Sequence, residues 1–83
     1  MQQRPEIDYP CPWTYVVVGM GEAVLTAHIE LALAGAEYTK ATSRHSRSGR
    51  YTSIEITLEV SDEEQRLVVF RALQNHPAVK LVI

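Results

Sequence analysis

One segment of the chain alternates apolar and polar side chains, and it restricts the possible folds more than any other. After the basic turn R-S-G-R, the sequence from Tyr51 to Val60 reads Y-T-S-I-E-I-T-L-E-V. Successive side chains of a β-strand point to opposite faces. One face therefore carries Thr52, Ile54, Ile56, Leu58 and Val60, and the other carries Tyr51, Ser53, Glu55, Thr57 and Glu59. Such a strand belongs to a sheet that is covered on one face only.

Length and composition indicate one small domain. The chain has 83 residues, of which 46% are hydrophobic and 22% charged, as is ordinary for a globular protein. Apolar stretches such as Val16 to Val18 and Leu67 to Phe70 are far shorter than the roughly 20 residues of a membrane span. We therefore predict no membrane association. The net charge of −2 gives the whole molecule no general attraction for nucleic acids.

The first twelve residues, M-Q-Q-R-P-E-I-D-Y-P-C-P, contain three prolines and lack the apolar core of a secretory signal. Proline lacks a backbone donor and disfavours helix before it, which predicts an extended arm over residues 1–12 and a domain over residues 13–83. Cys11 is the single cysteine and can form no internal disulfide. We expect a cytoplasmic protein.

Three elements are expected in the first half. Residues 13–18 are aromatic and β-branched and end at Gly19-Met20-Gly21, which predicts a strand and a turn. Residues 22–34 predict a helix that ends near Gly35. Its inner face is expected to carry Leu25, Ile29, Ala32 and Leu33. The polar stretch from Tyr38 to about Arg44 predicts a short strand at a sheet edge, followed by a loop over residues 46–49.

The second half predicts a helix and a final strand after the alternating one. Ser61 and Glu64 fit a capping box at the start of the helix, which should end at Asn75-His76-Pro77. Its inward residues are expected to be Val69, Phe70 and Leu73. The last strand is expected to alternate through Val79, Leu81 and Ile83.

The predicted order is βαββαβ. Right-handed crossovers then favour an α+β, ferredoxin-like sandwich, with a four-stranded antiparallel sheet and both helices on one face. The reverse face stays open and is expected to present Val16 and Val18, opposite Trp13, Tyr15 and Val17. A homo-oligomer through edge strands or open faces is one expected mode of association.

Three segments resemble the YbeD-like family of small, uncharacterised bacterial proteins. They are Tyr9-Pro10-Cys11-Pro12-Trp13-Thr14-Tyr15, Ser48-Gly49-Arg50-Tyr51-Thr52-Ser53-Ile54 and Val79-Lys80-Leu81-Val82-Ile83. The resemblance implies a ferredoxin-like fold close to ACT regulatory domains, which bind amino acids or other small effectors at subunit interfaces. It implies no catalytic residues. The loop over residues 44–48 departs from the family pattern by being longer and richer in arginine.

The sequence offers no convergent catalytic or metal-binding set. Cys11 lies in the arm, the serines near His45 lack an orienting third group, and Glu55 and Glu59 are four residues apart on one strand. The three histidines, His28, His45 and His76, show no ligand spacing. We therefore predict a protein that is not an enzyme and has no cofactor and no metal.

Three candidate ligand or partner surfaces remain, and the first two have simpler explanations. Gly19 and Gly21 could present amides to an anion, although a tight turn also needs glycine. Arg44, Arg47 and Arg50 form a basic hairpin that could contact an anionic partner or could only protect an edge strand.

Tyr51 gives the last candidate, because Arg47-Ser48-Gly49-Arg50-Tyr51 imitates the start of an RNA-recognition motif. Ser53 then replaces a second stacking aromatic, and Glu55 and Glu59 would repel phosphates. The favoured interpretation is a small regulatory or protein-interaction module that binds a protein partner or a small effector. Nucleic-acid binding through the hairpin and the open face is the alternative.

Overall fold

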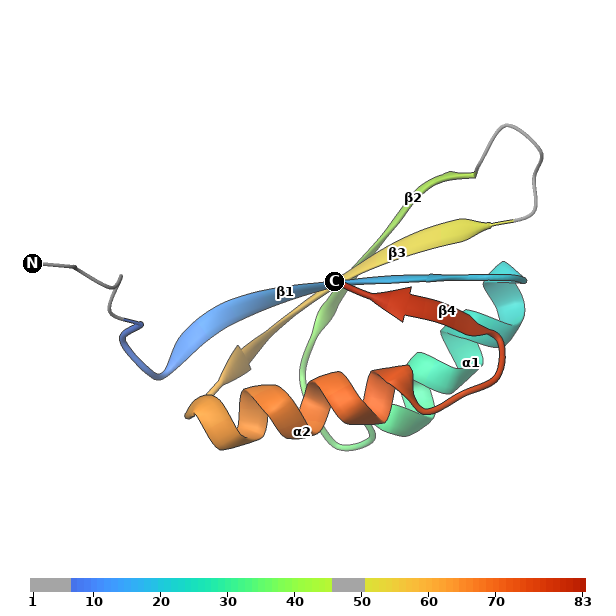
Figure 1. Cartoon of the computed structure of the whole chain (residues 1–83). Helices are drawn as coiled ribbons and strands as arrows, with labels where there is room; N and C mark the ends of the chain where they lie inside the picture. The colour runs from blue at the N-terminus through green and yellow to red at the C-terminus, as the bar shows by residue number, and fades with distance from the viewer. Residues whose placement is uncertain (1–6, 46–50) are drawn as a thin grey trace, which may run out of the picture.

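The computed structural model describes residues 7–45 and 51–83, without the side chains of residues 43–45, and it has the predicted element order. The elements are β1 (Cys11–Gly19), α1 (Glu22–Ala32), β2 (Thr39–His45), β3 (Thr52–Val60), α2 (Glu63–Gln74) and β4 (Val79–Val82). The four strands form one antiparallel sheet in the order β2-β3-β1-β4. Both helices cover the same face of the sheet (Figure 1), which confirms the ferredoxin-like α+β fold.

The alternation in β3 sets the core. Its five residues from Thr52 to Val60 that were expected to face inward are all buried, while Glu55 and Glu59 are exposed. β3 pairs with β1 over nine residues, so that Ile56 lies opposite Tyr15 and both side chains point toward the helices. The core therefore forms between the two central strands and the helix layer.

The first strand begins two residues earlier than expected, at Cys11, so the prediction of an arm through residue 12 was wrong at this end. Pro12 lies opposite Glu59 in the ladder. The N–H and C=O groups of one strand residue point to one neighbouring strand, and those of the next residue point to the other. Both groups of Val16 bond to Ile83 and thus point away from β3. Pro12 has the same parity, so its missing N–H removes no bond to β3. Proline at such an edge position is compatible with a strand.

The expected alternation in the last strand was also wrong. Val82 is the buried residue of β4, while Leu81 and Ile83 are exposed. The cause is a change of register: Gly19 pairs with Val79, but Val18 pairs with Leu81, so β4 contains one extra residue. A bulge of this kind shifts the side chains beyond it to the other face.

The two helices bury the faces that their periodicity predicts. Leu25 and Ile29 of α1 and Val69 and Leu73 of α2 are buried, whereas Phe70 is only half-buried. The cap of α2 lies one residue later than predicted. Asp62, not Ser61, accepts from the main-chain N–H of the third helical residue, and the side chain of that residue accepts from the N–H of Ser61.

Candidate functional site

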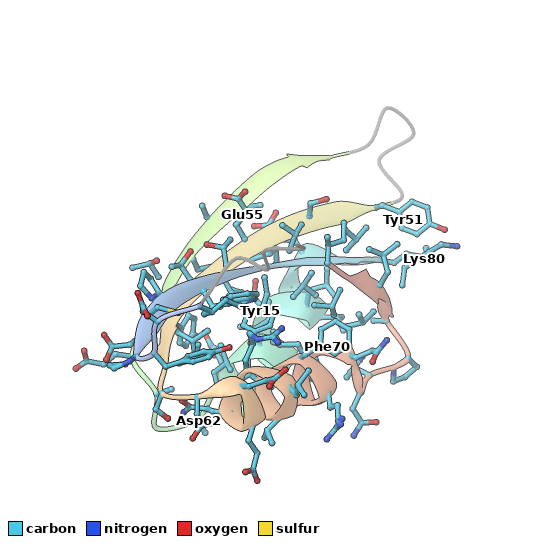
Figure 2. The ribbon with its side chains drawn as sticks, turned by 60° about the vertical axis from the view of Figure 1, so that its left-hand side comes forward. Tyr15, Tyr51, Glu55, Asp62, Phe70 and Lys80 are labelled. Carbon is cyan, nitrogen blue, oxygen red and sulfur yellow. The ribbon has the colours of Figure 1, made fainter. Side chains whose placement is uncertain are left out.

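The face of the sheet opposite the helices carries the side chains that the helices leave uncovered, and we call it the open face. Residues directly opposite one another in the ladder share a face, which places Val16, Glu55 and Ala41 in one row across three strands. The described members of the open face include Pro12, Thr14, Val16, Val18, Thr39, Ala41, Ser53, Glu55, Thr57, Glu59 and Leu81. Figure 2 shows Glu55 pointing away from the helix layer.

The open face divides into an apolar part and an acidic part. Val16 and Val18 of β1 lie next to Leu81 of β4, whose side chain is 38% exposed. Glu55 and Glu59 project from β3 beside them. At the usual rise of a strand these carboxylates are about 13 Å apart, too far for joint acid and base chemistry on one bond. The arrangement is suited to contact rather than to catalysis.

Tyr51 lies at one end of the open face. The ammonium of Lys80 is 5.6 Å from the centre of the Tyr51 ring, and Figure 2 shows the two side chains together. This distance allows a cation–π contact. Of the aromatic residues in the described strands, Trp13 and Tyr15 share the face of Val17 and point toward the helices. A stacking platform for RNA bases would need more than Tyr51.

The other candidate residues of the sequence do not join Tyr51 in one site. Gly19 is buried, and a Cβ there would meet the carbonyl oxygen of Ala78, so close packing explains this glycine. Gly21 adopts φ 87° immediately before α1, which explains the second glycine by backbone conformation. The side chain of Arg44 and the whole of Arg47 and Arg50 lie outside the described residues.

The rings of two histidines that are far apart in sequence lie next to each other between α1 and the connection after α2. Their spacing along the chain did not predict this contact. The rings of His28 and His76 are 4.7 Å apart, centre to centre. His28 Nε2 is 2.9 Å from the carbonyl oxygen of Leu73, and His76 Nδ1 accepts from the N–H of Ala78. Both rings thus join α1 to the connection between α2 and β4. Within the described residues no group of three metal-ligating side chains occurs.

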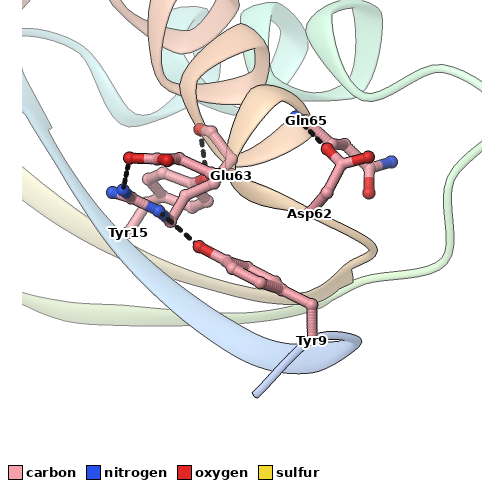
Figure 3. Close-up of polar contacts among 6 residues, drawn as sticks. Tyr9, Tyr15, Asp62, Glu63 and Gln65 are labelled. Atoms are coloured by element: carbon pink, nitrogen blue, oxygen red, sulfur yellow. Dashed lines mark hydrogen bonds and ion pairs between the residues drawn. The ribbon is translucent and has the colours of Figure 1, made fainter. Parts of the chain in front are cut away.

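A second cluster forms where the start of β1 meets α2 (Figure 3). Arg66 donates from Nε to the hydroxyl of Tyr9 at 3.1 Å, pairs with Glu63 at 3.4 Å, and places its guanidinium 4.6 Å from the centre of the Trp13 ring. The hydrogen bond with Tyr9 raises the pKa of Arg66 above its ordinary value. The Tyr15 hydroxyl donates to the carbonyl oxygen of Arg66 at 2.6 Å. Sequence reasoning missed this cluster.

Tyr15 makes the stability of the protein sensitive to high pH. Burial raises the pKa of Tyr15 above its ordinary value of 10.0, although the charge of Arg66 opposes the shift. When the pKa of a group is higher in the folded than in the unfolded protein, the protonated group stabilises the folded state. This stabilisation is complete at pH values below the unfolded-state pKa and is lost as the pH rises through the folded-state pKa. We therefore expect the free energy of unfolding, measured with urea, to fall more steeply as the pH rises above 10.0 than it does in Tyr15→Phe. Equal slopes in the two proteins would contradict this.

Comparison with known proteins places the chain in a family. The model of the family described as "Protein of unknown function (DUF493)" matches residues 4–83. The chain belongs to this family. It is 28% identical over 81 residues to a UPF0250 protein of Paraburkholderia phymatum, covering 93% of this chain and 91% of the relative. It is 30% identical over 82 residues to a UPF0250 protein of Neisseria meningitidis, covering 93% and 89%. The resemblance seen in the sequence is confirmed.

Two solved structures are similar in fold to this chain. Protein HP0495 from H. pylori is similar to this chain with a TM-score of 0.83 and 23% identity, over 98% of this chain and 89% of that one. The ACT domain from GTP pyrophosphokinase of Chlorobium tepidum is similar with a TM-score of 0.64 and 12% identity, over 87% and 94%. At these identities the likeness establishes an ACT-like fold alone. No helix in residues 7–45 or 51–83 is long and apolar enough to cross a membrane.

Proposed function

We propose that the protein is a non-enzymatic interaction module that binds a partner protein through the open face. The observation that carries this proposal is the row of Val16, Val18 and Leu81 beside the carboxylates of Glu55 and Glu59, on a sheet face that neither helix covers. An apolar strip bordered by charge is the composition of a protein interface, which combines a desolvated centre with a polar rim.

The charges on the open face specify the chemistry of the partner. Glu55 and Glu59 are exposed, and Lys80 is the one cation that the described residues place beside this face, where it contacts Tyr51. The expected partner presents an apolar ridge flanked by lysine or arginine, because complementary charges favour encounter and correct orientation. A second copy of this chain fits less well, since a two-fold contact brings the same acidic patch from both copies together.

The same carboxylates disfavour the nucleic-acid alternative. Phosphates would meet Glu55 and Glu59 across the middle of the face, and phosphate contacts supply most of non-specific affinity for nucleic acids.

A site-specific photo-crosslinker tests the proposal. Placed at Val18, it should capture one protein in cells, whereas the same group at Val68, on the exposed side of α2, should not. The captured protein is then purified and titrated against this chain. Glu55→Lys combined with Glu59→Lys should weaken its binding at least tenfold, and raising the salt concentration should weaken binding to the unchanged chain.

A matched charge change separates this surface from the rest of the molecule. Glu30→Lys combined with Glu64→Lys makes the same change of net charge on the helices and should leave binding within twofold. Equal losses in both double variants would overturn the proposal. It would also fail if Val18→Asp converted a dimer of the unchanged chain into a monomer in sedimentation, because the face would then belong to a second copy.

A further inference from the structure

The edge of the sheet at β2 exposes main-chain groups. Among the described residues, none forms a strand on the outer side of β2 (Figure 1). Val16 turns its N–H and C=O away from β3, so Glu55, which lies opposite Val16, turns its own groups toward β2. Ala41 lies opposite Glu55 and exchanges main-chain bonds with it. Its two neighbours, Lys40 and Thr42, therefore direct their N–H and C=O groups outward.

The side chains of Lys40 and Thr42 lie on the helix side of the sheet but remain in contact with water. They are opposite Ile56 and Ile54, and residues opposite one another share a face. Both isoleucines are fully buried, whereas Lys40 and Thr42 are exposed. The helix layer thus covers β3 and leaves β2 uncovered on this side.

An acidic groove of about 570 Å³ lies between α1 and β2. It is lined by Glu22, Ala23, Thr26, Ala27, Glu30 and Lys40. Glu22, Thr26 and Glu30 are spaced four residues apart, so they form one stripe along α1. The small side chains of Ala23 and Ala27 leave room between this stripe and the strand. The groove is therefore suited to a long cationic side chain that enters from the edge of the sheet.

We propose that β2 pairs with β2 of a second copy of this chain about a two-fold axis, which joins the two sheets into one continuous antiparallel sheet. Ala41 lies opposite the partner's Ala41. Lys40 of each copy lies opposite the partner's Thr42 and exchanges both main-chain hydrogen bonds with it, because both residues direct their groups outward. The surface is an edge of the sheet and is distinct from the open face.

Charge selects this register over its two neighbours. A two-fold pairing that joins outward groups can place Lys40 opposite the partner's Lys40, or opposite the partner's Thr42. The third possibility places Thr42 opposite the partner's Thr42 and then brings Lys40 opposite the partner's Arg44. Like charges directly opposite one another destabilise a sheet. Only the pairing of Lys40 with the partner's Thr42 keeps these cations apart.

The same register completes the acidic groove. The partner's Lys40 lies opposite Thr42, so its side chain points to the helix side, where Glu22 and Glu30 line the groove. The two-fold axis repeats this contact in the other copy, because the interface of such a dimer is formed by the same surface on both subunits. The chain thus supplies both the acidic groove and the cation that complements it. This self-complementarity favours a second copy over an unrelated strand.

A disulfide across the two-fold axis tests the register. Ala41 and the partner's Ala41 exchange no main-chain bonds, and the Cα atoms of such a pair are about 4.5 Å apart, within the range for a disulfide. In a Cys11→Ser background, which removes the single native thiol, Ala41→Cys should form a disulfide-linked dimer under mild oxidation. Thr39→Cys is the matched control, because its thiol lies on the same face but about 13 Å from its partner copy. It should crosslink at least tenfold more slowly. Equal rates would overturn the proposed register.

Sedimentation equilibrium tests the role of charge. Lys40→Glu should weaken dimerisation at least tenfold, because it places a carboxylate in the acidic groove, and adding Glu30→Lys should recover at least threefold of the loss. Lys80→Glu makes the same change of charge on β4 and should leave the dimerisation constant within twofold. Equal losses in Lys40→Glu and Lys80→Glu would overturn the assignment to β2. An unchanged chain that stays monomeric at about 1 mM would overturn the proposal altogether.

This test is independent of the proposed function. Val18→Asp, and Glu55→Lys combined with Glu59→Lys, alter the open face only and should leave the dimerisation constant within twofold. A monomeric Val18→Asp variant would overturn the assignment to the β2 edge. Failure of the open face to capture a partner protein would leave the dimerisation constant and the crosslinking at Ala41 unchanged, so the two proposals can fail separately.

Discussion

Truncation of Leu25 to alanine is expected to lower the free energy of unfolding by about 2 to 5 kcal/mol. The side chain is fully buried between α1 and the sheet, and its removal costs both the transfer of apolar surface and the cavity that is left. A chain of 83 residues has a total stability of roughly 4 to 12 kcal/mol. This single change therefore removes a large fraction of the stability and should lower the melting temperature by more than about 10 °C.

The same helix offers a matched control. Leu31 is 78% exposed, so Leu31→Ala deletes the same atoms from a position that contributes little burial. We expect its effect on the free energy of unfolding to be within about 0.5 kcal/mol. Urea denaturation of the unchanged protein and the two variants measures both changes, with one common dependence of the free energy of unfolding on urea concentration. Similar losses in the two variants would mean that α1 does not pack on the sheet through Leu25.

The central part of the fold could be predicted because the alternating pattern behind it extends over many residues. β3 repeats its alternation over nine residues, and a shift of one residue would turn every apolar side chain outward. The open face could be predicted for the same reason: once Ile54 and Ile56 point inward, Glu55 must point outward. Val16 and Val18 follow from the alternation of β1 in the same way.

The short elements contain too few residues for their patterns to fix register or helix start. β4 has four residues, and nothing in V-K-L-V reveals the extra residue that turns Val82 inward. At the start of α2 both Ser61 and Asp62 are good caps, each with a suitable residue three positions later. The choice between them depends on where the first helical turn meets the end of β3, which is a property of the packed structure.

The cluster around Arg66, where the start of β1 meets α2, depends on contacts between residues that are distant in sequence. Tyr15 and Arg66 are 51 positions apart, and Arg66 and Tyr9 are 57 apart. Local patterns contain neither fact, so Trp13 and Phe70 could be predicted only as core residues.

Gly19→Ala is expected to lower the free energy of unfolding by about 2 to 3 kcal/mol, which is the upper part of the range for overpacking. An added Cβ would collide with the main-chain carbonyl oxygen of Ala78 and come within 2.8 Å of Cδ2 of Leu25. The leucine methyl can move, but the carbonyl is held, because it accepts the N–H of Met20 at 3.0 Å. Relief therefore requires β1 and β4 to separate next to the bulge. Hydrogen exchange at the Met20 amide should become faster in the same variant.

Gly35→Ala distinguishes this steric effect from backbone strain. Gly35 has φ 84° and no atom within 4 Å of an added Cβ, so alanine there meets only the cost of the left-handed conformation, about 1 kcal/mol. The loss at Gly19 should thus exceed the loss at Gly35. The reverse order, with an unchanged exchange rate at Met20, would mean that close packing does not explain Gly19, and binding of an anion by the turn at Gly19 and Gly21 would again need to be tested.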